Sequence, residues 1–172
     1  GGGGRRESGR ERGKGPFSHA ARKGDMRNPE IMDGAGDLYS ALGGAYAIGK
    51  GKPAAYDGKP RKLFSACAGA ALYRKSALEL TGDFDESHFA YLEDVDIGYR
   101  ARILGFSNAY EPSAVVLHAG SATSGSRYNA FKVFYSARNK DYLIYNNMHP
   151  LQHPLNATLL LAGSALHSLF FR

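Results

Sequence analysis

Apolar side chains along the chain follow two spacings, and the first predicts strands. A run of apolar and small residues at 63–73 is typical of a buried strand that passes through Gly69. Two shorter apolar runs, at 107–110 and 114–118, predict two further strands that Pro112 separates.

The second spacing, of three to four residues, predicts helices. Apolar side chains recur at this spacing over 92–104, and Gly105 ends the pattern. A short helix is expected at 76–80, before Gly82, and a longer aromatic-rich helix at 128–147. Strands that alternate with helices predict an α/β layered domain.

Before residue 63 the pattern weakens. Residues 25–60 are rich in Gly and Pro, and the Asp-Gly-Ala-Gly-Asp sequence at 33–37 has the composition of a turn. The sequence therefore predicts a long surface loop here, of the kind that often forms a lid or a binding loop.

The basic charge of the chain is concentrated at its start. Residues 1–24 carry seven Lys and Arg against two Glu, whereas the other 148 residues carry 15 basic and 14 acidic side chains. We expect residues 1–24 to be a disordered Gly/Arg-rich tail. Such a tail could touch RNA or anionic lipid, but nucleic acid is not the expected partner.

The opposite end of the chain is apolar. Residues 155–171 are largely apolar but are interrupted by polar side chains. This pattern favours an interfacial or truncated membrane helix within a final segment at 151–172, and a buried core helix remains the alternative.

Acidic residues gather around the start of the predicted helix at 92–104. Six carboxylates fall between Asp83 and Asp96. Acidic side chains are favoured in the first turn of a helix, and Asp96 can pair with Arg100 four residues later, so the residues alone favour a solvated helix start.

A series of motifs changes this interpretation. In order they are Phe-Ser-Ala-Cys-Ala-Gly-Ala-Ala-Leu-Tyr-Arg-Lys at 64–75, Gly-Asp-Phe-Asp-Glu at 82–86, Phe-Ala-Tyr-Leu-Glu-Asp-Val-Asp-Ile-Gly-Tyr-Arg-Ala-Arg at 89–102, Tyr-Glu-Pro-Ser-Ala-Val-Val-Leu-His at 110–118, Gly-Ser-Ala-Thr at 120–123 and Ser-Ala-Arg-Asn at 136–139. Taken together, the series resembles family 2 glycosyltransferases of the rhamnosyltransferase-like kind. The resemblance covers roughly residues 30–150. It implies the C-terminal half of a GT-A domain, at 25–150.

The resemblance implies roles for particular residues. Asp94 would be the base that takes the proton of the acceptor hydroxyl in an inverting transfer. His118 would help to hold Mg²⁺ or Mn²⁺ on the diphosphate of the donor. Gly98 would leave room for a sugar, or would only allow close packing. The further substrate-binding residues that it implies are Gly69, Glu93, Asp96, Arg100 and Arg138.

The chain departs from the family pattern in one respect. The Asp-x-Asp motif that binds the metal should precede residue 30, and nothing there matches it. We therefore expect an incomplete enzyme, inactive by itself, that would use a nucleotide-sugar donor and a saccharide or lipid-linked acceptor. It would act in the cytoplasm at the inner face of the cell membrane. The alternative is a non-catalytic binding fragment or degenerate transferase that retains only an acceptor groove.

Overall fold

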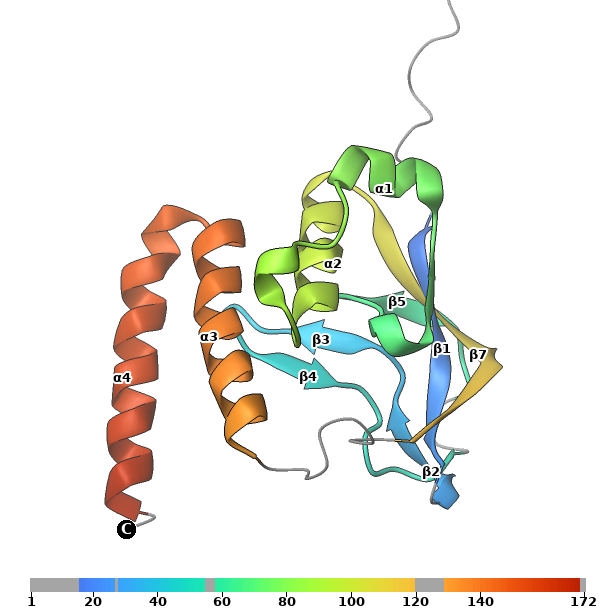
Figure 1. Ribbon diagram of the computed structural model, residues 1–172, viewed down its shortest axis with the longest axis horizontal. Helices are drawn as coiled ribbons and strands as arrows, with labels where there is room; N and C mark the ends of the chain where they lie inside the picture. Colours follow the sequence, from blue (N-terminus) through green and yellow to red (C-terminus); the bar gives the residue numbers. More distant parts are fainter. Residues whose placement is uncertain (1–15, 27, 55–57, 120–128, 171–172) are drawn as a thin grey trace, which may run out of the picture.

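A computed structural model describes residues 16–26, 28–54, 58–119 and 129–170 of the chain. In this part of the chain a five-stranded mixed sheet and a separate two-stranded hairpin combine with four α-helices (Figure 1). The predicted α/β class is therefore confirmed.

Strand β1 (Pro16–Asp25) lies in the middle of the large sheet. It runs parallel to β7 (Ser107–His118) on one side. On its other side, the first half of β1 pairs antiparallel with β6 (Ala71–Tyr73) and the second half with β2 (Asn28–Gly34). The backbone of β1 is thus hydrogen-bonded along both edges.

This position of β1 corrects one prediction. The expected disordered tail over 1–24 is wrong for residues 16–24, which form most of β1. Pairing with three strands satisfies their backbone polar groups, and Phe17 and Ala20 are fully buried in the core. Residues 1–15 lie outside the described part of the chain.

The expected surface loop at 25–60 is also more ordered than predicted. Besides β2, it contains an antiparallel hairpin of β3 (Asp37–Tyr39) and β4 (Ala45–Ala47). Strand β5 (Arg61–Leu63) follows and pairs antiparallel with β7. These strands are short, so their periodicity in the sequence is weak.

Two predicted strand boundaries are wrong as well. The run at 63–73 is not one strand, because a 3₁₀ turn, η2 (Ala68–Ala70), separates β5 from β6. The runs on either side of Pro112 form the single strand β7, and a register shift against β1 at this point accommodates the proline.

The predicted helices are confirmed to within a few residues. They are α1 (Lys75–Thr81), α2 (Glu93–Ile103) and α3 (Ala130–Asn147). Helix α2 has acidic residues in its first turn and basic residues in its last turn, which complements the helix dipole. The Asn129 side chain accepts the Lys132 N–H and caps the start of α3.

The last helix, α4 (His153–Phe170), follows the 3₁₀ turn η4 (Pro150–Gln152). Its Leu155, Leu159 and Leu161 side chains are exposed, so they do not belong to a buried core in this structure. No helix in the described ranges, α4 included, is both long enough and apolar enough to cross a membrane.

Two clusters of buried apolar side chains form the core around β1. The first consists of Ala20, Met32, Ala35, Leu63, Ala66 and Tyr110. The second joins β1 to α1 and α2 and consists of Phe17, Ala77, Ile97, Ala101 and Phe106. Each large apolar side chain that is fully buried contributes about 1.5–3 kcal/mol. Helix α2 is therefore fixed directly on the central strand.

Gly98 brings α2 close to the segment that follows β5. A Cβ atom at Gly98 would lie 2.5 Å from Ser65 Cβ and 3.1 Å from Ser65 Cα. Both atoms belong to or adjoin the backbone, so they cannot move aside easily. Of the two roles considered for Gly98, the structure supports close packing.

Gly98→Ala should therefore lower the free energy of unfolding by about 1–3 kcal/mol, the usual cost of overpacking a core. Urea denaturation measures this change. Gly69→Ala is the matched control, because a Cβ there meets no atom within 4 Å and the stability should change by less than about 0.5 kcal/mol. An unchanged free energy of unfolding in Gly98→Ala would show that the segment around Ser65 moves aside without destabilising the fold.

Candidate active site at the start of helix α2

Asp94 lies in the first turn of α2, where it is partly buried. Its Oδ2 atom accepts the backbone N–H of Ala68 at 3.1 Å. Its Oδ1 atom makes no hydrogen bond to the described residues. One oxygen is therefore held in place by η2, and the other is left to accept a proton or a hydrogen bond.

Glu93 precedes Asp94 and is also partly buried. Its Oε2 atom is buried without a hydrogen-bond partner among the described residues. Burial raises the pKa of Glu93, and the charge of Asp94 acts in the same direction. Glu93 Oε2 is thus buried without a partner, whereas Asp94 Oδ2 accepts the N–H of Ala68.

Asp37, at the start of β3, is a third carboxylate at this site, and the sequence analysis did not identify it. Its backbone pairs with Ser65, in the segment that also packs against α2. Burial and then the charge of Asp94 raise the pKa of Asp37 to about 7. The Asp-Gly-Ala-Gly-Asp motif was the available signal, but its composition indicated only a turn.

A second polar group forms where β1 and β7 end. Lys23 Nζ lies 3.3 Å from Asp33 Oδ2, and His118 Nδ1 lies 2.8 Å from the same oxygen. Lys23 also donates a hydrogen bond to Cys67 Sγ at 3.2 Å. Because β1 and β7 are parallel, their carboxyl ends meet, and this brings Lys23 and His118 together.

The charges in this second group stabilise one another. Burial alone would lower the pKa of Lys23, but Cys67 and Asp33 outweigh it and the pKa is raised. Burial alone would raise the pKa of Asp33, but Lys23 and His118 lower it. Both groups are therefore held in their charged forms.

The two polar groups are connected through η2. Cys67, which Lys23 contacts, is followed directly by Ala68, whose N–H binds Asp94. Contacts therefore run without a gap from the start of α2 to His118. The start of α2 and the ends of β1 and β7 are thus linked through Cys67 and Ala68.

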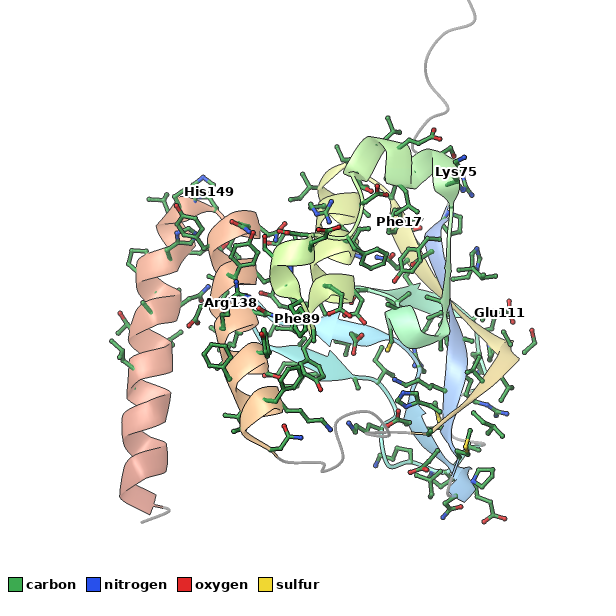
Figure 2. All side chains as sticks on the ribbon, in the orientation of Figure 1. Phe17, Lys75, Phe89, Glu111, Arg138 and His149 are labelled. Carbon is green, nitrogen blue, oxygen red and sulfur yellow. The ribbon has the colours of Figure 1, made fainter. Side chains whose placement is uncertain are left out.

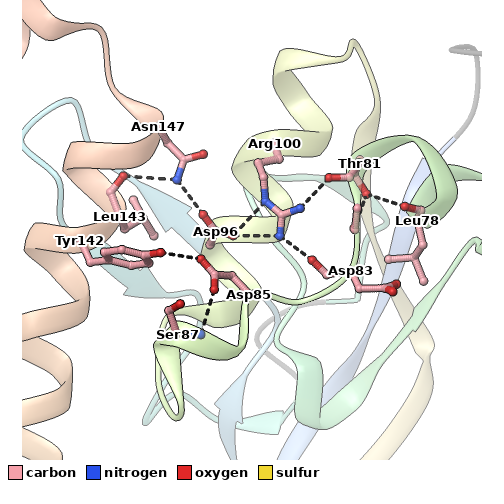
Figure 3. A network of polar contacts seen from close by, with 11 residues as sticks. Leu78, Thr81, Asp83, Asp85, Ser87, Asp96, Arg100, Tyr142, Leu143 and Asn147 are labelled. Carbon is pink, nitrogen blue, oxygen red and sulfur yellow. Dashed lines mark hydrogen bonds and ion pairs between the residues drawn. The ribbon is translucent and has the colours of Figure 1, made fainter.

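Asp96 lies between Arg100 of α2 and Asn147 of α3 (Figure 3). Its Oδ2 accepts from Arg100 at 2.9 Å, which confirms the predicted pair four residues apart, and its Oδ1 accepts from Asn147 at 2.7 Å. Arg100 also donates to the carbonyls of Thr81 and Asp83. These contacts are structural and give no support to substrate binding by Asp96 or Arg100.

The other predicted binding residues lie on both sides of Asp94. Gly69 is exposed in η2, next to the N–H that holds Asp94, and has open space beside it. Arg138 lies on α3 and is directed toward the loop that precedes α2 (Figure 2). It donates to the carbonyl of Ser87 and to Asn139 Oδ1. The structure thus brings Gly69 and Glu93 to Asp94 and gives Arg138 a contact with the loop.

His118 can be tested as a metal ligand from its neighbours. A carboxylate that binds one ring nitrogen of a histidine commonly orients the other nitrogen for a metal, and Asp33 makes this contact with Nδ1. No group of three or more His, Cys, Asp or Glu side chains suited to a metal occurs among the described residues. The contact with Asp33 leaves Nε2 as the ring nitrogen of His118 that a metal could bind.

No protein-family model matches the chain. Two relatives, from the Mycobacterium tuberculosis strains CDC 1551 / Oshkosh and ATCC 25618 / H37Rv, are each described as an N-acetylglucosaminyl-diphospho-decaprenol L-rhamnosyltransferase. Each is 46% identical over 54 residues, which is 31% of this chain but only 18% of the relative. This partial similarity supports a glycosyltransferase function in general.

The raised pKa of Asp37 leads to a test of the site's electrostatics. The Asp37 carboxyl binds its proton more tightly in the folded protein than in the unfolded chain, where its pKa is near 3.8. The associated stability is present below pH 3.8 and is lost as the pH rises through about 7. Asp37→Asn carries no charge, so it should be more stable than the wild type at pH 8 by on the order of 1–3 kcal/mol and should show little difference at pH 4.

Urea denaturation at pH 4, 6 and 8 measures this dependence. Asp141→Asn, which changes an exposed aspartate on α3, is the control and should show no such trend. A stability difference for Asp37→Asn that is the same at all three pH values would mean that Asp37 is not buried as described.

Proposed function

We propose that this chain belongs to an inverting glycosyltransferase of family 2, with a GT-A domain, that transfers a sugar from a nucleotide-sugar donor. The observation that carries the proposal is the setting of Asp94. A carboxylate fixed by one backbone N–H, with its second oxygen available, stands at a helix start beside the open space at Gly69. The series of motifs and the partial similarity to two named rhamnosyltransferases support the same conclusion.

In the proposed reaction Asp94 acts as the general base. The acceptor hydroxyl gives its proton to Asp94 while its oxygen forms a bond to the anomeric carbon of the donor sugar. On the opposite side of that carbon, the bond to the diphosphate oxygen breaks, and the nucleoside diphosphate leaves with the electron pair. Attack opposite the leaving group inverts the configuration at the carbon.

The leaving diphosphate requires charge stabilisation, for which we propose Mg²⁺ or Mn²⁺ with His118 as a ligand. When bound, the ion would neutralise the charge that develops on the diphosphate. Asp33 would hold the His118 ring in place through Nδ1. Lys23 keeps Asp33 ionised, so this support would persist at neutral pH.

We propose a saccharide or lipid-linked acceptor, and action at the inner face of the cell membrane. The support for the acceptor is the name of the two relatives, which specifies a sugar on diphospho-decaprenol. The exposed leucines of α4 support contact with a membrane surface. Because the match covers under a fifth of the relatives' length, the proposal concerns the complete gene product.

Separate substitutions of Asp94 and Asp96 distinguish a catalytic base from a structural carboxylate. Asp94→Asn keeps the shape but cannot accept the proton, so kcat should fall roughly 10²–10⁴-fold with donor binding nearly unchanged. The Asp96 side chain accepts hydrogen bonds from Arg100 and Asn147. Asp96→Asn should therefore lower the free energy of unfolding by on the order of 1–3 kcal/mol, with a much smaller effect on kcat. Steady-state kinetics and urea denaturation of the complete gene product measure both.

A larger loss of kcat in Asp96→Asn than in Asp94→Asn would show that the base has been assigned wrongly. If the wild-type protein transfers no sugar from any nucleotide-sugar donor, a binding protein without catalysis becomes the correct description.

His118→Ala tests the proposed metal ligand. Loss of one imidazole should raise the Mn²⁺ concentration for half-maximal activity roughly 10–100-fold. His149→Ala, which removes an exposed imidazole between α3 and η4 (Figure 2), is the control and should leave this concentration unchanged. An unchanged Mn²⁺ requirement in His118→Ala would rule out the ligand role.

A further inference from the structure

The loop that leads into α2 has an unusual backbone. Phe89, Tyr91 and Leu92 have positive φ angles of 59°, 71° and 67°, and no other described residue except glycine does. Side chains with a Cβ rarely adopt this conformation. The three residues lie directly before Glu93 and Asp94.

The strain is greatest at Phe89. Its ψ is −55°, and the N–H of Ala90 donates to the carbonyl of His88 at 2.6 Å. A hydrogen bond between residues two apart around a residue with positive φ defines the rare, strained form of the γ-turn. Phe89 gains little from burial, because the residue is 73% exposed. Other contacts must therefore hold the turn.

One side chain of α3 supplies these contacts. Asn139 is fully buried, and its Nδ2 lies 2.8, 2.7 and 2.8 Å from the carbonyl oxygens of His88, Ala90 and Tyr91. Its Oδ1 accepts from Arg138. The reverse orientation of the amide would place Oδ1 against three acceptors, so only the donor nitrogen fits.

Other α3 side chains also contact this loop, and the Phe131 and Tyr135 rings pack against the Phe89 ring with centroid distances of 6.2 and 5.2 Å. Arg138 donates to Ser87, and Tyr142 donates to Asp85 (Figure 3). Asn139 alone among the described residues contacts the carbonyls on both sides of Phe89. Strained backbone persists only where its surroundings enforce it, and such backbone is frequent at active sites.

We infer that Asn139 is a positioning residue: by holding the γ-turn at Phe89, it sets the backbone from which Asp94 enters the site. Asn139 is too deeply buried to touch a substrate, so its effect passes through residues 88–93. The inference rests on the proposed role of Asp94, but the state of the loop can be measured without any activity.

Asn139→Asp is the sharpest test, since it keeps the shape and replaces the donor nitrogen by an acceptor. Amide hydrogen exchange at residues 88–94 should accelerate at least about 10-fold, while exchange in β1 and β7 stays unchanged. In the complete gene product, kcat should fall roughly 10–100-fold with the donor KM within about twofold. Asn146→Asp, the same change at an exposed position of α3, should alter neither quantity.

Phe89→Gly provides a second test, because glycine adopts a positive φ angle without strain and the turn then depends less on Asn139. In a Phe89→Gly background, Asn139→Asp should reduce kcat less than it does in the wild type. Should Asn139→Asp fail to fold, Asn139→Ser, which keeps one donor, takes its place with the same expected directions.

Faster exchange at 88–94 with an unchanged kcat would overturn the positioning role and leave the proposed function intact. Unchanged exchange would overturn the inference whatever happens to kcat. A wild-type protein without transferase activity would instead refute the proposed function, and the exchange experiment would still decide whether Asn139 holds the turn.

Discussion

The parallel pairing of β1 with β7 is the constraint on which the rest of the structure depends. It places β1 between three strands, and the Phe17 side chain of β1 then forms the surface on which α1 and α2 pack. The same pairing brings the carboxyl ends of both strands together, so that Lys23 and His118 meet Asp33. Without β1, neither helix α2 nor the polar group at the strand ends would be positioned.

The two halves of the site are held by different means. The group at the strand ends is fixed by backbone pairing in the sheet, which has few alternatives once its register is set. Asp94 is reached through a strained loop, and Asn139 of α3 donates to three of its carbonyl groups. The protein thus joins a rigid half to one whose geometry depends on a few buried hydrogen bonds.

The sequence predicted the features that depend on local pattern. The helices follow the spacing of their apolar side chains, and the Asp96–Arg100 pair follows from their separation by one helical turn. Strand β1 was missed because its Arg22 and Lys23 and its small residues lack alternation, and its stability comes from partners up to 93 residues away. Asp37 and Asn139 were missed for the same reason, since their neighbours become visible only after folding.

The charges of the site explain why the proposed reaction would need a cation. Asp33, Asp37, Glu93 and Asp94 all lie along one connected region, and a donor diphosphate would add further negative charge. The ammonium of Lys23, which lies nearest the strand ends, is already paired with Asp33. Burial lowers the effective dielectric and makes the remaining repulsion stronger than it would be in water. Burial raises the pKa values of Asp37 and Glu93, and the charge of Asp94 adds to both shifts in the same direction. The divalent ion proposed near His118 would offset part of this negative charge and so let the diphosphate approach Asp94.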